Sequence, residues 1–145
     1  MVNIGNWLVY LHVLSAFVFV GGIVGREATL AFARRQQNIE AFTQLYDLIR
    51  WFTIKIINPG SHAILIFGLL TAWVRGWPLL GILQGSTINW LFVSLLLYLT
   101  TIPLVFLVLI PRGKFLAHQL ATAHVQGAVT PEVRAALDDP VVRVA

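Results

Sequence analysis

Cysteine is missing from this 145-residue sequence, and charged residues are scarce. The absence of cysteine excludes disulfides, thiolate metal sites, iron–sulfur ligation and cysteine nucleophiles. Charged residues make up 11% of the chain, against about 25% in a soluble domain, while 58% are hydrophobic. These proportions exclude a soluble domain and a disordered chain, and they indicate a multi-pass membrane protein.

Acidic residues are the rarest charged type, with six against ten Lys and Arg. Most acids lie outside the apolar runs, and no paired-carboxylate site, phosphate loop or nucleophile–base arrangement is present. We therefore predict no catalytic residues, and an enzyme is the less favoured class. The basic residues carry no recognition motif and do not cluster on one soluble face, so a nucleic-acid partner is not expected.

Three long apolar runs predict three transmembrane helices, over about residues 6–26, 51–74 and 88–110. Pro59 interrupts the second run, where a continuous, kinked helix is favoured. Its 24 residues would span about 36 Å, whereas a start at Pro59 would give about 24 Å, short of the ~30 Å hydrocarbon core. Before it, residues 36–50 are amphipathic and predict an interfacial helix. The predicted fold is an all-α integral membrane helical bundle with a cytoplasmic helical tail.

The predicted domains are a transmembrane helical domain, residues 1–114, and a juxtamembrane helical tail, residues 115–145. In the tail, Gly127 is a helix-stop signal and Thr130-Pro131 is a helix-start signal. Asp139-Pro140 is a second start signal, but the five residues after it are too few for a stable helix. We therefore expect the natural chain to continue into a further span beyond residue 145.

The basic residues predict the orientation in the membrane. The segment between the first two spans and the segment after the third hold most of them: Arg26, Arg34, Arg35, Arg50, Lys55, Arg112 and Lys114. The N-terminal lead has none, and the second connection has only Arg75. The positive-inside rule then predicts that the N-terminus faces out and that the tail is cytoplasmic. Four tryptophans fall at the outer boundary of this topology: Trp7, Trp73, Trp77 and Trp90.

The first apolar run has two different faces. At 100° per residue, one face carries all of its polar groups and consists of His12, Ser15, Ala16, Phe19, Gly22 and Arg26. Gly21 and Gly25 lie roughly opposite, in a Gly-x-x-x-Gly arrangement that allows another backbone to approach closely. The helix is therefore expected to contact protein on both sides. Packing within the bundle and a dimer seam are both open as roles for Gly21 and Gly25.

His12 and His62 are candidate functional residues, because ionisable groups inside a bilayer often carry function. They are candidate ligands of one b-type haem, although their predicted depths differ by about 9 Å. The alternatives are a proton relay and a neutral histidine bonded to a neighbouring helix, for example to Ser94, Tyr98 or Thr101. His118 and His124 fall on opposite sides of a helix, so no metal site is predicted from them. Arg26 and Glu27 are expected to form a charge pair at the membrane boundary.

Four segments carry a resemblance to a known family: LHVLSAFVFVGG, NPGSHAILIFGLLTAW, GWPLLG and LVLIPR. Together they resemble an uncharacterised bacterial family of small multi-pass integral membrane proteins, a domain of unknown function. The resemblance implies four transmembrane helices, so the fourth helix of the family is missing from these residues. The first helix is also distantly similar to copper-resistance D proteins and to the haem-linked membrane protoporphyrinogen oxidase. Those proteins carry a histidine early in their first helix, so the similarity implies a functional role for His12.

These observations predict a non-catalytic multi-pass membrane protein, an accessory or structural subunit that packs in a larger bacterial membrane complex. Its expected partners are the lipid bilayer and other transmembrane helices, of a complex or of a homo-oligomer. The alternative is a small b-type haem-binding or redox membrane protein that uses His12 and His62. The haem hypothesis predicts a Soret band in the absorption spectrum, whereas the non-catalytic subunit predicts none.

Overall fold

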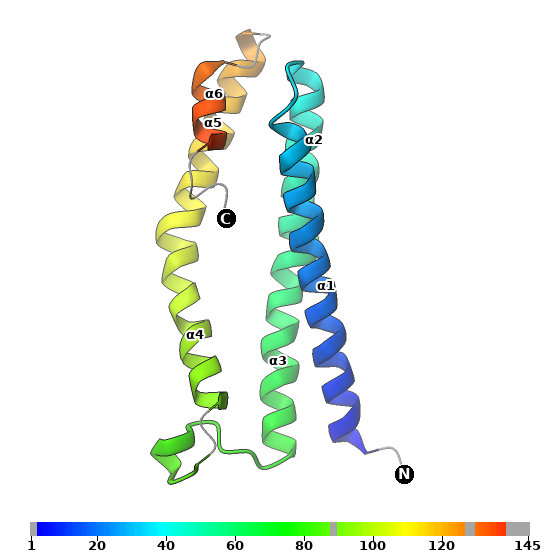
Figure 1. The fold of residues 1–145 in the computed structure, drawn as a ribbon, viewed down its shortest axis with the longest axis vertical. Coiled ribbons are helices and arrows are strands. Elements are labelled where there is room, and N and C mark those ends of the chain that lie inside the picture. Colours follow the sequence, from blue (N-terminus) through cyan, green and yellow to red (C-terminus); the bar gives the residue numbers. More distant parts are fainter. Residues whose placement is uncertain (1–2, 88–89, 127–129, 139–145) are drawn as a thin grey trace. The chain divides into compact units, whose positions relative to one another are not determined.

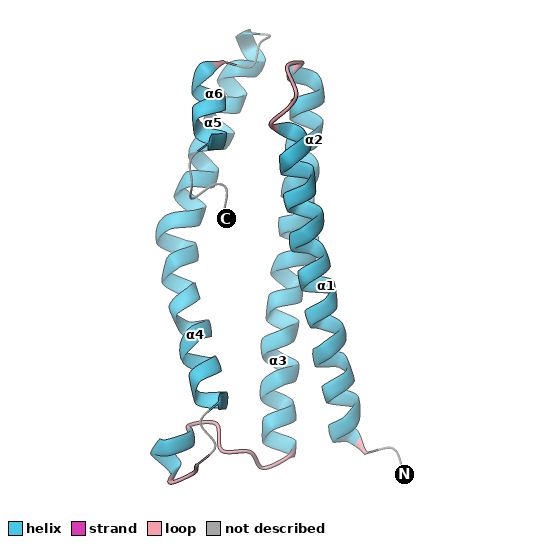
Figure 2. Ribbon diagram, in the orientation of Figure 1, coloured by secondary structure: helices cyan, strands magenta, loops and turns pink. Residues whose placement is uncertain are grey.

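The computed structural model describes residues 3–87, 90–126 and 130–138, and the regular elements among them are all helical (Figure 1, Figure 2). The α-helices are α1 (Ile4–Ala33), α2 (Ile39–Trp51), α3 (Asn58–Val74), α4 (Trp90–Leu104), α5 (Ile110–Gln126) and α6 (Pro131–Asp138). A short 3-10 helix, Gly81–Gln84, lies in the connection before α4. The predicted all-α fold is confirmed.

Within the described residues, three continuous helical stretches are long and apolar enough to cross a membrane: Ile4–Ala33, Ile39–Val74 and Trp90–Gln126. This confirms the three predicted spans, but each helix is longer than its apolar run. The apolar residues mark only the part of a helix that suits lipid, and the polar residues beside them continue the same helix. Residues 88 and 89 of the third predicted span lie outside the described residues.

The second and third stretches remain helical through prolines by means of wide turns. Phe52–Ile57 and Val105–Leu109 are π-helical, and each segment ends two residues before a proline, Pro59 or Pro111. In each case the residue directly before the proline donates its N–H to the carbonyl five residues back. Asn58 donates to Thr53, and Ile110 donates to Val105. Proline has no N–H and its ring crowds the carbonyl four residues back, so the chain adopts the wider turn there. The predicted continuity through Pro59 is confirmed.

The predicted amphipathic helix before the second span is also confirmed, and it begins at Ile39 rather than at residue 36. The Asn38 side chain accepts a hydrogen bond from the Glu40 N–H at 2.8 Å, which caps the helix start. Of the five apolar residues at helical spacing in this segment, Ile39, Phe42 and Ile49 are buried, and Leu45 and Tyr46 are half-buried.

The chain forms two compact units. Met1–Thr29 and Leu48–Val93 make up the first, and Leu30–Asp47 and Ser94–Ala145 make up the second. In the second unit the core consists of apolar side chains from α1, α2, α5 and α6: Leu30, Ala33, Ile39, Phe42, Leu116, Leu120, Ala123, Val133 and Ala136. In the first unit the buried positions are mostly small residues, among them Gly22, Gly60 and Ala72. The predicted division after residue 114 falls inside α5.

The predicted start of the last helix at Thr130-Pro131 is confirmed. The Thr130 hydroxyl accepts a hydrogen bond from the Val133 N–H at 3.4 Å, and Pro131 is the first helical residue. The pKa of the Glu132 carboxyl lies below its ordinary value, because it accepts hydrogen bonds from its own backbone N–H and from the Thr130 hydroxyl. Gly127 and Asp139-Pro140 lie outside the described residues.

Candidate functional site

The contacts of α1 follow one antiparallel register along the helix that holds α3 (Figure 1). At one end the Arg75 guanidinium donates to the Asn6 side chain at 3.1 Å. Farther along α1 the contacts move steadily back along the partner helix: His12 at Gly68, Phe19 at Gly60, Gly22 at Ile56 and Gly25 at Phe52. The register therefore holds from the N-terminal end of α1 to the level of Gly25.

We define the glycine seam as Gly22, Gly25, Gly60 and Gly68, where the two helices approach closely. A Cβ on Gly22 would lie 2.6 Å from Ile56 Cγ2, and one on Gly25 would lie 2.8 Å from the Phe52 ring. A Cβ on Gly60 would lie 3.3 Å from the Phe19 Cα, which belongs to the backbone of α1. These close approaches leave little room for a side chain, as is usual where small residues line a contact between membrane helices.

The face of α1 against the seam is the polar face predicted from the sequence. His12, Phe19 and Gly22 belong to that face, and all three contact the partner helix. Gly21 lies away from the contact, with no atom within 4 Å of the position of an added Cβ. Of the two glycines predicted to pack against a helix, Gly25 thus meets Phe52, and Gly21 faces open space within the described chain.

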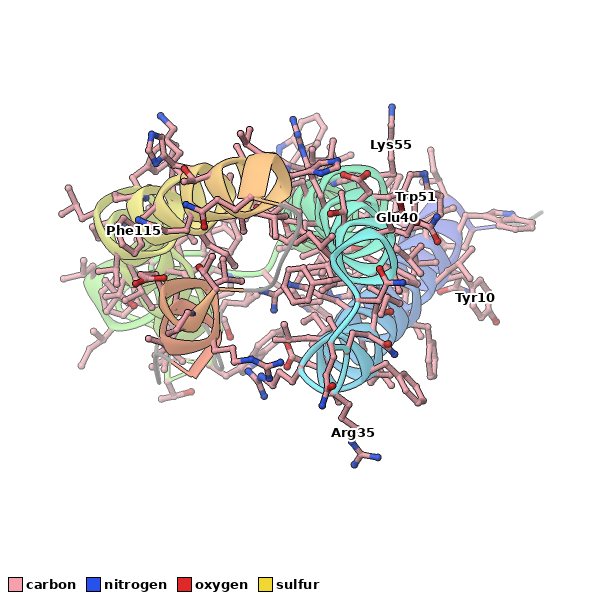
Figure 3. All side chains as sticks on the ribbon, turned by 90° about the horizontal axis from the view of Figure 1, so that it is seen from above. Tyr10, Arg35, Glu40, Trp51, Lys55 and Phe115 are labelled. Carbon is pink, nitrogen blue, oxygen red and sulfur yellow. The ribbon has the colours of Figure 1, made fainter. Side chains whose placement is uncertain are left out.

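The opposite face of α1 is apolar and exposed around Gly21. Its large side chains, between 60% and 73% exposed, are Tyr10, Leu14, Phe17 and Val24. Figure 3 shows Tyr10 pointing away from the ribbon. With Gly21 these residues follow a spacing of four, three, four and three, which keeps them on one side of the helix. We call this set the outward face of α1.

His12 joins α1 to α3 by a hydrogen bond. Its Nδ1 lies 2.9 Å from the Ile64 carbonyl oxygen, and its ring packs 3.1 Å from the position of a Cβ on Gly68. A carbonyl oxygen only accepts, so Nδ1 carries the hydrogen and donates it. The imidazole is then neutral when Nε2 keeps its lone pair. The interhelical bond expected of a structural histidine is present, and its acceptor is the Ile64 carbonyl.

His62 is exposed and bonds within its own helix, with Nδ1 2.6 Å from the Asn58 carbonyl oxygen. The carbonyls used by His12 and His62 are six residues apart, about 9 Å along the helix axis. The structure therefore does not bring the two imidazoles to one level of α3.

The remaining polar candidates are at the ends of the spans. Arg26 and Glu27 form an ion pair at 2.5 Å, with side chains 13% and 39% exposed. His118 and His124 are both exposed on α5. Where the chain is described, no group of three or more His, Cys, Asp and Glu side chains is placed to hold a metal ion.

A cluster around Arg75 ends the contact between α1 and α3. The guanidinium lies over the Trp77 ring at 5.3 Å from its centroid, and Trp77 packs edge-on against Trp90 at 5.6 Å. Gly76, at φ +65°, lets the chain turn so that the Trp77 N–H donates to the Ala72 carbonyl at 2.8 Å. An arginine packed beside two tryptophans is typical of a membrane–water interface.

Sequence reasoning did not single out Gly60 and Gly68. Their eight-residue separation places them about 80° apart around a helix, within one broad face, which was the one available signal. That α1 approaches this side depends on the register of two helices, which a single sequence does not reveal.

Comparison with known proteins gives one family and no individual relative. Residues 6–138 match the family described as "Predicted integral membrane protein (DUF2269)". Neither the comparison with curated proteins nor that with solved structures finds a match. The matched residues include the glycine seam, His12, His62 and nearly all of the three helices that are long and apolar enough to cross a membrane. The chain therefore belongs to the DUF2269 family of predicted integral membrane proteins, as the resemblance of its sequence motifs had implied.

Proposed function

We propose that this integral membrane protein is a non-catalytic subunit that joins other transmembrane helices of a larger bacterial membrane assembly through α1. The observation that carries the proposal is the contrast between the two sides of α1. One side is packed along the glycine seam, and the outward face is apolar with open space at Gly21.

Helix association in lipid supports this role for the outward face. Lipid tails are as apolar as leucine, so helices associate through close packing at small residues rather than through a hydrophobic driving force. Gly21 offers such a position between Phe17 and Val24. Three polar side chains of α1 are engaged elsewhere: Ser15 and Thr29 donate to carbonyls of their own helix, and His12 donates to α3.

Gly21→Leu is expected to reduce the assembled form about tenfold or more without unfolding the chain, because a leucine fills the open notch and holds a neighbouring helix away. Gly113→Leu is the matched control, since a Cβ there also meets nothing within 4 Å. The measurement is native electrophoresis and crosslinking of membranes in mild detergent, with circular dichroism as the folding check. A parent protein that runs as a monomer and crosslinks to nothing contradicts the proposal.

The proposal includes the bacterial inner membrane, with the N-terminus outside and the tail cytoplasmic. The α1–α3 register supports it, because Arg75 lies beside Asn6 at one end, while Arg26 and Lys55 both lie toward the other end. From Trp7 to Arg26 is 19 residues, about 28 Å of helix, close to the ~30 Å hydrocarbon core.

The orientation is tested by single cysteines, since the parent chain has none. Thr87→Cys, in the exposed second connection, is expected to react in intact cells with a maleimide that does not cross membranes. Gln37→Cys, exposed between α1 and α2, is expected to react only after the cells are opened. The reverse labelling pattern would overturn the proposed orientation.

A haem-binding or redox protein is the second candidate, and one observation favours it. Both His12 and His62 donate Nδ1–H to backbone carbonyls, which leaves Nε2 free as a ligand atom. Metal-binding histidines are commonly fixed by such a bond. Protein from haem-replete cells is then expected to show a Soret band that is lost in His12→Ala. No Soret band in the parent protein rules this candidate out.

A further inference from the structure

Arg34 has buried charged atoms without a partner. It follows α1 directly, and its backbone N–H donates to the Leu30 carbonyl at 3.1 Å. Its side-chain Nε and Nη2 are buried, and neither has a hydrogen-bond partner in the structure. Across the described chain, no other buried side-chain nitrogen or oxygen atom is left in this state.

A guanidinium keeps its positive charge at any ordinary pH, so Arg34 does not escape burial by losing a proton. A buried, charged donor without an acceptor is strongly unfavourable. Arg26, eight residues earlier, shows the usual solution, because it pairs with Glu27. Arg34 sits in the second compact unit, where Glu40, Asp47 and Glu132 are all exposed, and none of them pairs with it.

The two unpartnered atoms define the shape of the missing acceptor. Nε and Nη2 lie on one edge of the planar guanidinium, so their N–H bonds point the same way. This edge matches two oxygens of one phosphate or carboxylate group in a bidentate pair. An oxyanion with two adjacent oxygens is the acceptor that fits this edge.

The length of α1 indicates where that oxyanion comes from. Arg34 is 27 residues beyond Trp7, about 40 Å along the helix. If Trp7 lies at one edge of the ~30 Å hydrocarbon core, Arg34 lies about 10 Å past the other edge, in the headgroup layer. Phosphate groups of lipids are the abundant oxyanions at that depth.

We propose that Arg34 binds the phosphate group of an anionic phospholipid through its Nε and Nη2 atoms. The site is separate from the outward face of α1 and from both intramembrane histidines. A free phosphate ion offers the same oxygens, so the experiment has to separate the two sources.

The test measures the thermal unfolding of the full chain in neutral detergent micelles. Three additions are compared: phosphatidylglycerol, the phosphorus-free lipid monoolein, and inorganic phosphate. Phosphatidylglycerol is expected to raise the melting temperature by several degrees more than monoolein, because it binds only the folded state. Native mass spectrometry of the same samples gives the number of lipids retained.

Three variants separate a built site from general charge attraction. Arg34→Gln is expected to weaken phosphatidylglycerol binding about tenfold or more. Arg35→Gln removes the same charge from the neighbouring, exposed residue and is expected to change binding less than about twofold. Arg34→Lys keeps the charge but lacks the two parallel N–H donors. It is therefore expected to bind phosphatidylglycerol almost as weakly as Arg34→Gln.

The outcomes are distinct. Equal stabilisation by phosphatidylglycerol and monoolein overturns the proposal, as does an equal loss of binding in Arg35→Gln and Arg34→Gln. Stabilisation of the same size by inorganic phosphate, lost in Arg34→Gln, supports the phosphate site but assigns it to the free ion. If Arg34→Gln does not fold, the parent and Arg34→Lys still decide, because Arg34→Lys binding as tightly as the parent contradicts a two-pronged contact.

Discussion

Gly22→Ala is expected to destabilise the packing of α1 on its partner helix by about 1–3 kcal/mol, the usual effect of adding atoms to a packed interior. The added Cβ would lie 2.6 Å from Ile56 Cγ2, 3.2 Å from Ile56 Cβ and 3.1 Å from Ile57 Cγ1. Isoleucine is branched at Cβ and has few rotamers in a helix, so it does not turn aside easily. The helices have to separate locally, and the contacts on either side weaken.

Gly21→Ala is the matched control, one residue away in the same helix. Its Cβ meets nothing within 4 Å, and alanine favours a helix over glycine by up to about 1 kcal/mol. The control variant is therefore expected to unfold at the same denaturant concentration as the parent or at a slightly higher one. Unfolding in detergent micelles, followed by circular dichroism, measures both variants. Equal stability of the two variants would show that the seam is looser than the geometry indicates.

The sequence was sufficient to predict the elements whose signals are local. The apolar runs predicted three spans, and Thr130-Pro131 predicted a helix start. The helical spacing of Ile39, Phe42 and Ile49 predicted an amphipathic helix, in which all three are buried. Each of these follows from residues within a few turns of one another. The polar face of α1 was also evident, since His12, Phe19 and Gly22 recur at helical spacing. The helix start at Asn38 was not predicted.

The interhelical pairings were not predictable, because they depend on how far one helix slides along another. A slide of one turn, about 5.4 Å, would take His12 from the Ile64 carbonyl and set a different residue at Gly68. The π-helical form of the turns before Pro59 and Pro111 was not predictable either. Proline predicts an interruption of the helix, but a kink, a break and a wide turn can all accommodate the missing N–H.

The second large effect concerns Gly25 and Gly60, which look alike in the sequence but face different kinds of atoms. A Cβ at Gly25 would meet the far end of the Phe52 ring, at 2.8 Å from both Cε1 and Cζ. A Cβ at Gly60 would meet Phe19 Cβ at 3.2 Å, Cα at 3.3 Å and N at 3.5 Å. Both single alanine variants are expected to be destabilised by about 1–3 kcal/mol, measured by unfolding in micelles.

Truncating the facing phenylalanine is expected to rescue one of the two variants. Phe52→Ala removes the ring atoms that obstruct Gly25→Ala, so the double variant should be more stable than the two separate losses predict. Such a coupling between contacting residues is about 0.5–3 kcal/mol. Phe19→Ala leaves the Cβ, Cα and N of residue 19 in place, so Gly60→Ala should not be rescued, and the two losses should add or exceed their sum.

The comparison of the two cycles isolates the backbone contact, because each uses a glycine-to-alanine and a phenylalanine-to-alanine change. Rescue in the Gly25–Phe52 cycle alone means that α1 and α3 touch through their main chains at Gly60, as the 3.3 Å distance to Phe19 Cα requires. Equal rescue in both cycles would mean that the helices can move apart at Gly60, and the close approach would then be wrong. In that case His12 would also lose its fixed position against Gly68, since the same register holds both contacts.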